Sequence, residues 1–130
     1  MESSLMFLLV LMITITMFAA ESHKLPALCP LPSTEPVCTT GTEIEHWQQH
    51  EVLLKQINDA GCCIVSYYGG FPIYSYSYCR DDNPKAGCKV CLEEAAGIVV
   101  QNCNNTHGAR YTRPSGSCCI RYENYQFCSP

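Results

Sequence analysis

The chain has 130 residues, a formal net charge of −4 and eleven cysteines. A length of this order holds one domain, and the scattered acidic residues argue against nucleic acid as a partner and against cationic membrane disruption. Every cysteine follows residue 28, and such a density is typical of small proteins that are oxidised outside the cell. Because eleven is odd, at least one thiol stays free or links a second chain in a disulfide-bonded dimer.

An apolar run over residues 5–18 opens the chain, and Ala19-Ala20-Glu21 follows it. This order predicts a signal peptide over residues 1–20 that is cleaved near Ala20. A membrane anchor is the alternative, but a membrane-spanning helix needs about 20 apolar residues and this run is shorter. No later run is long enough to cross a bilayer, so we expect a secreted, extracellular protein without a membrane span.

Residues 21–37 contain four prolines, which exclude a helix there. We expect this stretch to form an extended N-terminal segment that Cys29 can attach to the surface. Residues 42–59 have helical periodicity instead, with Thr42 as a candidate N-cap and Gly61 available to end the helix.

His46 and His50 are four residues apart in this predicted helix, a spacing that can bind a metal ion. Trp47 stands where a zinc protease would carry its glutamate, so we expect no catalytic metal. His50 falls inside the apolar stripe of the helix, between Trp47 and Leu53. A partly buried neutral histidine resists protonation, so we expect acidification toward about pH 5 to loosen this helix.

Two short segments, residues 62–68 and 73–78, are rich in β-branched and aromatic residues and predict strands. Their tyrosines pack on the sheet or, alternatively, form an aromatic platform for sugars or a partner protein. A second helix fits residues 85–101, and residues 110–112 and 118–127 predict two strands with a turn between them. Together these elements predict an α+β fold, with two helices packed against an antiparallel sheet.

The cysteine spacing is the most specific pattern in the chain. Cys79-x8-Cys88-x2-Cys91 is followed by Cys103 and by the run Cys118-Cys119-Ile120-Arg121-Tyr122-Glu123, and the intervening residues 104–110 end in Gly-Ala-Arg. In these features the chain resembles the cysteine-rich secretory domain of plants. That domain occurs in ginkbilobin-like antifungal proteins, in the ectodomains of cysteine-rich receptor-like kinases and in plasmodesmata-located proteins.

The resemblance implies that residues 38–130 form one disulfide-stapled domain with two helices on a five-stranded antiparallel sheet. Rival interpretations of Cys88-x2-Cys91, a redox pair or half of a zinc site, lack a βαβ context and a second pair of ligands. The implied bridges are Cys38–Cys103, Cys79–Cys88 and Cys91–Cys118. The remaining cysteines, whose pairing stays open, should form one or two further bridges and leave one thiol: Cys29, Cys62, Cys63, Cys119 and Cys128.

Some ginkbilobin-like proteins bind mannose through an asparagine, an arginine and a glutamate. The matching positions are Thr39, Arg110 and Glu123, so the resemblance implies a mannose-type glycan site in which threonine replaces the asparagine. A guanidinium that donates and a carboxylate that accepts can together bind a pair of sugar hydroxyls. If Cys91 bonds Cys118, strand alternation makes Glu123 face away from the helices. An outward arginine and glutamate equally describe an ordinary surface ion pair.

The resemblance implies a secreted defence protein of the plant apoplast, antifungal and able to bind mannose-type glycans of cell walls or fungi. The alternative is an apoplastic protein-interaction module whose partners are receptor ectodomains or cell-wall proteins. A protease inhibitor is a weaker third interpretation. Neither a kinase domain nor a membrane helix follows the domain, so we expect the free secreted form.

No nucleophile elbow, paired catalytic carboxylates or phosphate-binding loop is present, so we expect a non-enzyme without a cofactor. Asn104-Asn105-Thr106 is a glycosylation sequon close to Arg110. A glycan on Asn104 would crowd the predicted sugar site.

Overall fold

The computed structural model describes residues 4–9, 26–39 and 48–130. The predicted cleavage site near Ala20 lies outside the described residues, as do Thr42, His46 and Trp47 of the first predicted helix. Residues 4–9 are helical. No helix within the described residues combines the length and the apolar character that a membrane span needs.

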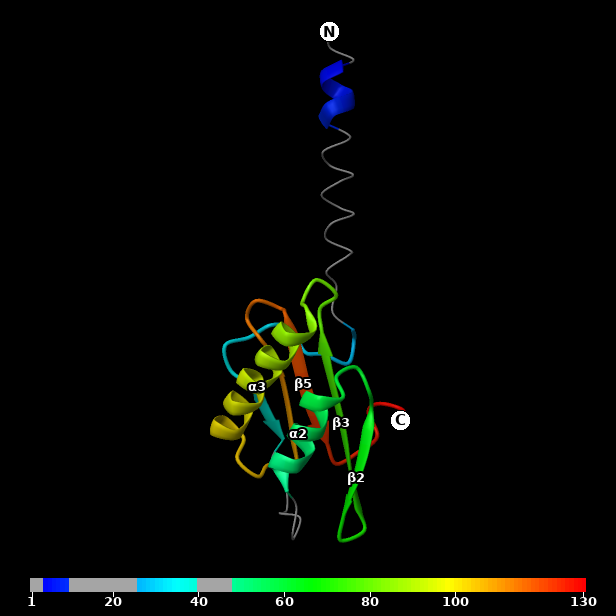
Figure 1. The fold of residues 1–130 in the computed structure, drawn as a ribbon, viewed down its shortest axis with the longest axis vertical. Coiled ribbons are helices and arrows are strands. Elements are labelled where there is room, and N and C mark those ends of the chain that lie inside the picture. The colour runs from blue at the N-terminus through cyan, green and yellow to red at the C-terminus, as the bar shows by residue number, and fades with distance from the viewer. Residues whose placement is uncertain (1–3, 10–25, 40–47) are drawn as a thin grey trace.

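Five antiparallel strands form one sheet in the order β1-β4-β5-β3-β2, so β5 is central and β1 and β2 are the edges (Figure 1). Gly69 and Gly70 have φ angles of 58° and 86° and make the two-residue turn between β2 and β3, a turn that needs positive φ at both positions. The strands are β1 (Val37–Thr39), β2 (Ile64–Tyr68), β3 (Phe71–Cys79), β4 (Gly108–Thr112) and β5 (Cys118–Glu123).

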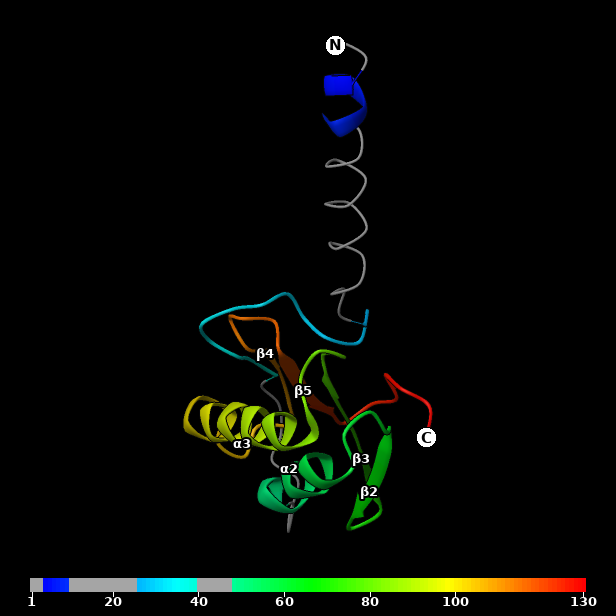
Figure 2. The same cartoon turned by 45° about the horizontal axis from the view of Figure 1, so that its top comes forward.

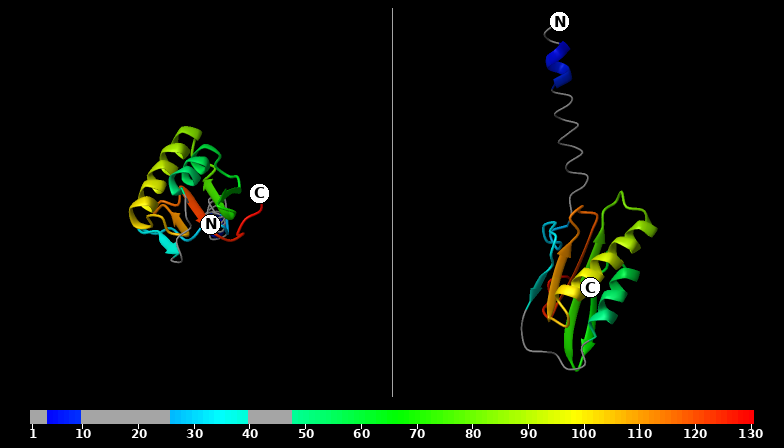
Figure 3. Two further views of the ribbon diagram at one scale, coloured as in Figure 1. Left: turned by 90° about the horizontal axis from the view of Figure 1, so that it is seen from below. Right: turned by 90° about the vertical axis from the view of Figure 1, so that its left-hand side faces the viewer.

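Two helices, α2 (Gln49–Asn58) and α3 (Lys85–Asn102), lie side by side on one face of this sheet (Figure 2). The left view of Figure 3 shows the two layers from their end, with both helices on the same side of the strands. The predicted α+β fold, two helices on a five-stranded antiparallel sheet, is confirmed.

The core lies between α3 and the centre of the sheet. Leu92, Ala95 and Val99 recur at helical spacing on α3 and are each at most 1% exposed, as are Tyr111 and Ile120 on the facing strands. A stripe of this kind makes the helix stable because it buries apolar surface against the sheet. The helix begins directly after Pro84, whose fixed φ suits a helix start.

The last strand is shorter than predicted, since β5 ends at Glu123 and not at residue 127. Beyond Glu123 the chain leaves the sheet and runs to Cys128. This cysteine bonds Cys63, which lies directly before the edge strand β2. A strand that continued to residue 127 would keep the tail in line with β5 and away from Cys63.

The structure has five disulfides and one free cysteine. Two bridges go beyond those the resemblance implies, and they attach the segment before β1 and the segment after β5 to the sheet. The free thiol belongs to Cys62, which is exposed. The three pairs that the resemblance implies are all formed, Cys38–Cys103, Cys79–Cys88 and Cys91–Cys118, and the two others are Cys29–Cys119 and Cys63–Cys128.

Candidate functional site

Thr39, Arg110 and Glu123 share the face of the sheet that lies away from the helices, which we call the back face. Gly108 lies between Thr39 and Glu123, and a Cβ at that glycine would be 2.9 Å from Thr39 Oγ1 and 2.8 Å from Glu123 Oε2. The missing side chain therefore lets these two residues approach each other. Arg110 lies two residues further along β4, opposite Arg121 of β5.

Glu123 faces away from the helices as predicted, but it is buried, which corrects the expectation that its carboxylate is open to solvent. Its side chain is 2% exposed, and Oε1 lies 3.7 Å from Arg121 Nε. Burial raises the pKa of the Glu123 carboxyl above its ordinary value of 4.5, while the charges of Arg121 and Arg110 and a hydrogen bond with Tyr125 act in the opposite direction. Strand alternation predicts the direction of this side chain, but its exposure depends on what covers it.

Two segments outside the sheet cover the back face, and both contact Arg121. From residues 26–36, the carbonyl oxygen of Leu28 accepts a hydrogen bond from Arg121 Nη1 at 3.3 Å. From the C-terminal segment, Tyr125 accepts one from Arg121 Nη2 at 3.1 Å, and the Phe127 ring lies 4.2 Å from the guanidinium. Arg121 thus joins both segments to the ion pair with Glu123.

Two of the three predicted sugar ligands reach solvent, because Thr39 and Arg110 are exposed. The third, Glu123, already neutralises Arg121 in a buried pair. A sugar on this face can contact the Arg110 guanidinium and the Thr39 hydroxyl directly. It reaches the carboxylate only if the covering segments move.

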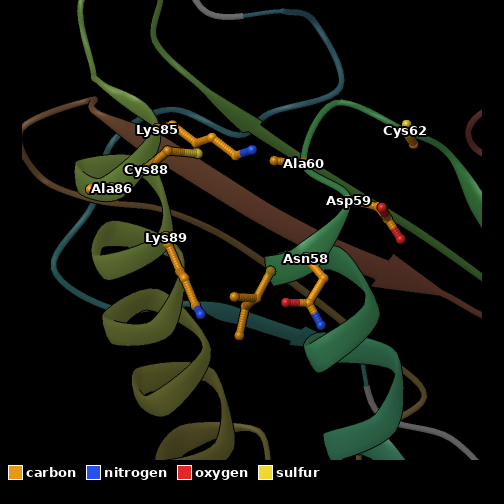
Figure 4. Close-up of a pocket in the computed structure, with 9 residues that line it drawn as sticks. Asn58, Asp59, Ala60, Cys62, Lys85, Ala86, Cys88 and Lys89 are labelled. Carbon is orange, nitrogen blue, oxygen red and sulfur yellow. The ribbon is translucent and has the colours of Figure 1, made fainter.

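A cavity of about 790 Å³ opens on the other side of the molecule, between the end of α2 and the start of α3 (Figure 4). Ala60 and Ala86 contribute to its apolar lining, and Lys85 and Lys89 stand on its α3 side. Figure 4 shows Lys85 extending across the opening toward Ala60, whereas Asp59 points away from it. Within the described residues neither lysine forms an ion pair, so the rim of the cavity is positive.

A second hollow of about 490 Å³ continues along the same pair of helices. Ile57 lines both hollows, and we call them together the α2–α3 groove. Leu54 lines it and is 58% exposed, although its neighbour Leu53 is buried in the core. None of the sequence patterns considered above predicts this groove. The adjacent leucines Leu53 and Leu54 could have indicated it. Neighbouring positions on a helix are about 100° apart, so both side chains cannot face the sheet and one of them must lie at the surface.

His50 lines this groove and is exposed, so the expectation that it is partly buried is wrong. The buried position is Gln49, whose Nε2 donates hydrogen bonds to Cys103 O at 2.8 Å and to Tyr122 Oη at 2.7 Å. The glutamine can be buried there because its side-chain amide donates both of these hydrogen bonds. The exposure of His50 removes the physical reason for the predicted loosening of the helix by acid.

The glycosylation sequon follows α3. Asn104 is exposed, while Thr106 is half-buried and its hydroxyl donates to the carbonyl oxygens of Cys103 and Gly108 at 3.0 and 2.9 Å. Glycosylation of Asn104 stays a prediction. In the part of the chain that the structure describes, no cluster of three His, Cys, Asp or Glu side chains could hold a metal ion.

The family model for salt stress response/antifungal proteins matches residues 37–125. The chain belongs to this family. A relative from Arabidopsis thaliana, putative cysteine-rich repeat secretory protein 61, is 37% identical over 59 residues, which cover 45% of this chain and 22% of that protein.

Two solved structures share the fold: the tandem DUF26 ectodomains of the Arabidopsis thaliana cysteine-rich receptor-like proteins PDLP5 and PDLP8. The TM-scores are 0.58 and 0.59 at sequence identities of 20% and 16%, over 71% and 74% of this chain. The chain covers 50% of each ectodomain. It therefore spans half the length of these solved chains and about a fifth of the curated relative.

Proposed function

We propose that the protein is an extracellular interaction module whose α2–α3 groove binds a segment of another protein with apolar and acidic side chains. One observation carries the proposal: a positive rim, Lys85 and Lys89, borders an exposed apolar floor in a chain whose net charge is −4. An acidic partner would be repelled by much of this surface and attracted at the groove.

The chemistry of the groove supports a protein partner. Covering the exposed part of Leu54 would contribute about 1–2 kcal/mol to binding. Carboxylates near Lys85 and Lys89 would add charge-assisted contacts that mainly fix orientation and speed association. Receptor ectodomains and cell-wall proteins of the apoplast are the partner classes we propose. Secretion by cleavage near Ala20 belongs to the same proposal, and N-terminal sequencing of secreted protein should find Glu21 at or near its start.

The test uses the secreted protein as bait in apoplastic fluid, with retained proteins quantified by mass spectrometry. We expect a partner that the parent protein retains and that both Leu54→Asp and Lys85→Glu with Lys89→Glu lose. Val90→Asp is the matched control, because Val90 is 53% exposed on α3 and does not line the groove. A partner peptide should then bind the parent and fail to bind the groove variants. If all four proteins retain the same partners to the same extent, the groove does not bind them.

Mannose-type glycan binding with antifungal action is the second candidate. The joint exposure of Thr39 and Arg110 on the back face supports it, and the burial of Glu123 limits it to weak binding, near millimolar, or about −4 kcal/mol. A mannose glycan array and a hyphal growth assay would compare the parent with Arg110→Ala, and Asn104→Gln would report crowding by a glycan. Equal array signals from the parent and Arg110→Ala would remove this candidate.

A further inference from the structure

The two edges of the sheet differ in how well they are protected. Edge β1 has three residues, follows Pro36 and is tied to the end of α3 through Cys38. Edge β2 has five residues, Ile64–Tyr68, without a charge or a proline among them. Sheet edges in soluble proteins usually carry charges, prolines or coverings, because an open edge offers unpaired backbone groups to another strand. Edge β2 lacks the first two of these devices, and the covering near it is the C-terminal segment, which is attached at Cys63, directly before the strand.

Pro72 determines which backbone groups of β2 face outward. Tyr67 lies opposite Pro72, which has no N–H, so these two residues cannot form a hydrogen-bonded pair. Bonded and non-bonded pairs alternate along an antiparallel ladder, so Val65 and its partner also form a non-bonded pair. The N–H and C=O groups of Val65 and Tyr67 therefore point away from β3. No hydrogen bond among the described residues uses them on that side.

We propose that β2 is a dimerisation edge, where it pairs antiparallel with β2 of a second copy of this chain. A two-fold axis through Ser66 places Val65 of each copy opposite Tyr67 of the other. Both of these pairs are then hydrogen-bonded pairs, because all four residues direct their N–H and C=O groups toward the partner. The register is self-complementary, as a symmetric dimer requires, and the two sheets become one continuous sheet.

The surroundings of β2 fit a second copy. Tyr67 is 71% exposed and would gain cover from Val65 of the other chain, an aromatic and β-branched cross-strand pair of the kind that stabilises sheets. Lys55 and Glu51, which contact β2 from α2, form an ion pair with each other at 3.2 Å. Together these two side chains carry no net charge, so they would not repel the same pair in a second copy of the chain.

This dimer differs from one linked through the free cysteine. In the proposed register the two Cys62 residues lie eight positions apart along the ladder, about 26 Å at ~3.3 Å per residue. They cannot form a disulfide across it. Cys62→Ser therefore gives a background in which dimerisation through the edge is measured alone.

Amide hydrogen exchange tests the pairing directly. Secreted Cys62→Ser protein would be followed over a range of concentrations by sedimentation velocity and by NMR-detected exchange. We expect a concentration-dependent dimer in which the Val65 and Tyr67 amides become protected, while the Ser66 amide is protected at every concentration. A monomer at all concentrations, or a dimer in which these two amides exchange as fast as in the monomer, would overturn the proposal.

A matched pair of variants gives the second readout. Tyr67→Asp places like charges near the two-fold axis and should weaken dimerisation about tenfold through its two symmetric positions. Phe71→Asp removes a similar exposed aromatic, 60% exposed, from the neighbouring strand and should leave dimerisation unchanged. Equal dimerisation by both variants and the parent would contradict an edge pairing at β2. Proton NMR of each monomer checks that the fold is intact.

Discussion

The two faces of the sheet are closed by different means. On the helix face, α3 covers the sheet with aliphatic side chains such as Leu92 and Val99. On the back face, the sheet presents Arg110, Arg121 and Glu123, and short segments attached by disulfides cover part of it. Apolar burial and three disulfides from α3 and its C-terminal end hold the first face, whereas the second has no helix layer and is held by two disulfides and by hydrogen bonds from Arg121.

The direction in which a side chain points and its exposure to solvent are therefore separate properties. Side chains on both faces of β5 are buried, although only one face carries a helix layer. The back face is therefore only partly open, at Thr39 and Arg110, and among the described residues the α2–α3 groove and the β2 edge are further exposed surfaces.

The largest effect is expected in the core of the helix face. Leu92→Ala leaves a cavity beneath α3, where Leu92 is fully buried, and should lower the free energy of unfolding by about 2–5 kcal/mol. Val90→Ala, two residues away and exposed, should change it by less than about 0.5 kcal/mol. Denaturant unfolding of both variants measures the difference. Equal losses would mean that α3 does not pack as described.

Removing one of the two cross-links of the back face should have the next largest effect. Replacing Cys29 and Cys119 together by alanine should lower the free energy of unfolding by about 2–4 kcal/mol. The Ser33 amide, which donates to Thr112 O at 3.2 Å, should exchange much faster, because its segment is no longer attached. Amides within α3 should keep their relative protection. If Ser33 stays as protected as before, hydrogen bonds alone hold that segment.

A smaller, pH-dependent effect is expected at Glu123. Its pKa is raised by burial in the folded protein, so the folded state holds the proton more tightly than the unfolded chain does. Its stabilising contribution is therefore complete below about pH 4.5 and is lost as the pH rises through the folded-state pKa. The loss is about 1.4 kcal/mol for each unit between the two pKa values.

The free energy of unfolding would be measured by urea titration at a series of pH values. Glu123→Gln should remove the decrease expected as the pH rises above about 4.5. Glu93→Gln, on the exposed side of α3, is the control and should follow the parent. Identical profiles for Glu123→Gln and the parent would show that the carboxyl does not titrate differently on folding.

The smallest effect on stability is expected at Cys62, which is exposed at the surface. Cys62→Ser should change the free energy of unfolding by less than about 0.5 kcal/mol. We expect non-reducing gels to show a covalent dimer of the parent that the variant lacks, with all five bridges kept in peptide maps. A covalent dimer that persists in Cys62→Ser would mean that another cysteine is unpaired.

Patterns in the amino-acid sequence were enough to predict most helices and strands and three of the five disulfides. Hydrophobic periodicity predicts α3 within one residue at its end, and the cysteine motif with its resemblance implies three of the bridges and the family. These are local or spacing signals, and periodicity of side chains along a helix or strand is enough to read them.

Which side chains are buried and which are exposed depends on the tertiary structure. Strand alternation turns Glu123 from the helices, but its burial depends on Arg121 beside it and on Tyr125 of the segment after β5. Helix periodicity places His50 near an apolar stripe. In the structure α2 is turned by about one residue relative to that expectation, so Gln49 is buried and His50 is exposed. Exposure depends on segments that are distant in sequence and meet only in the fold, so no local pattern in the chain specifies it.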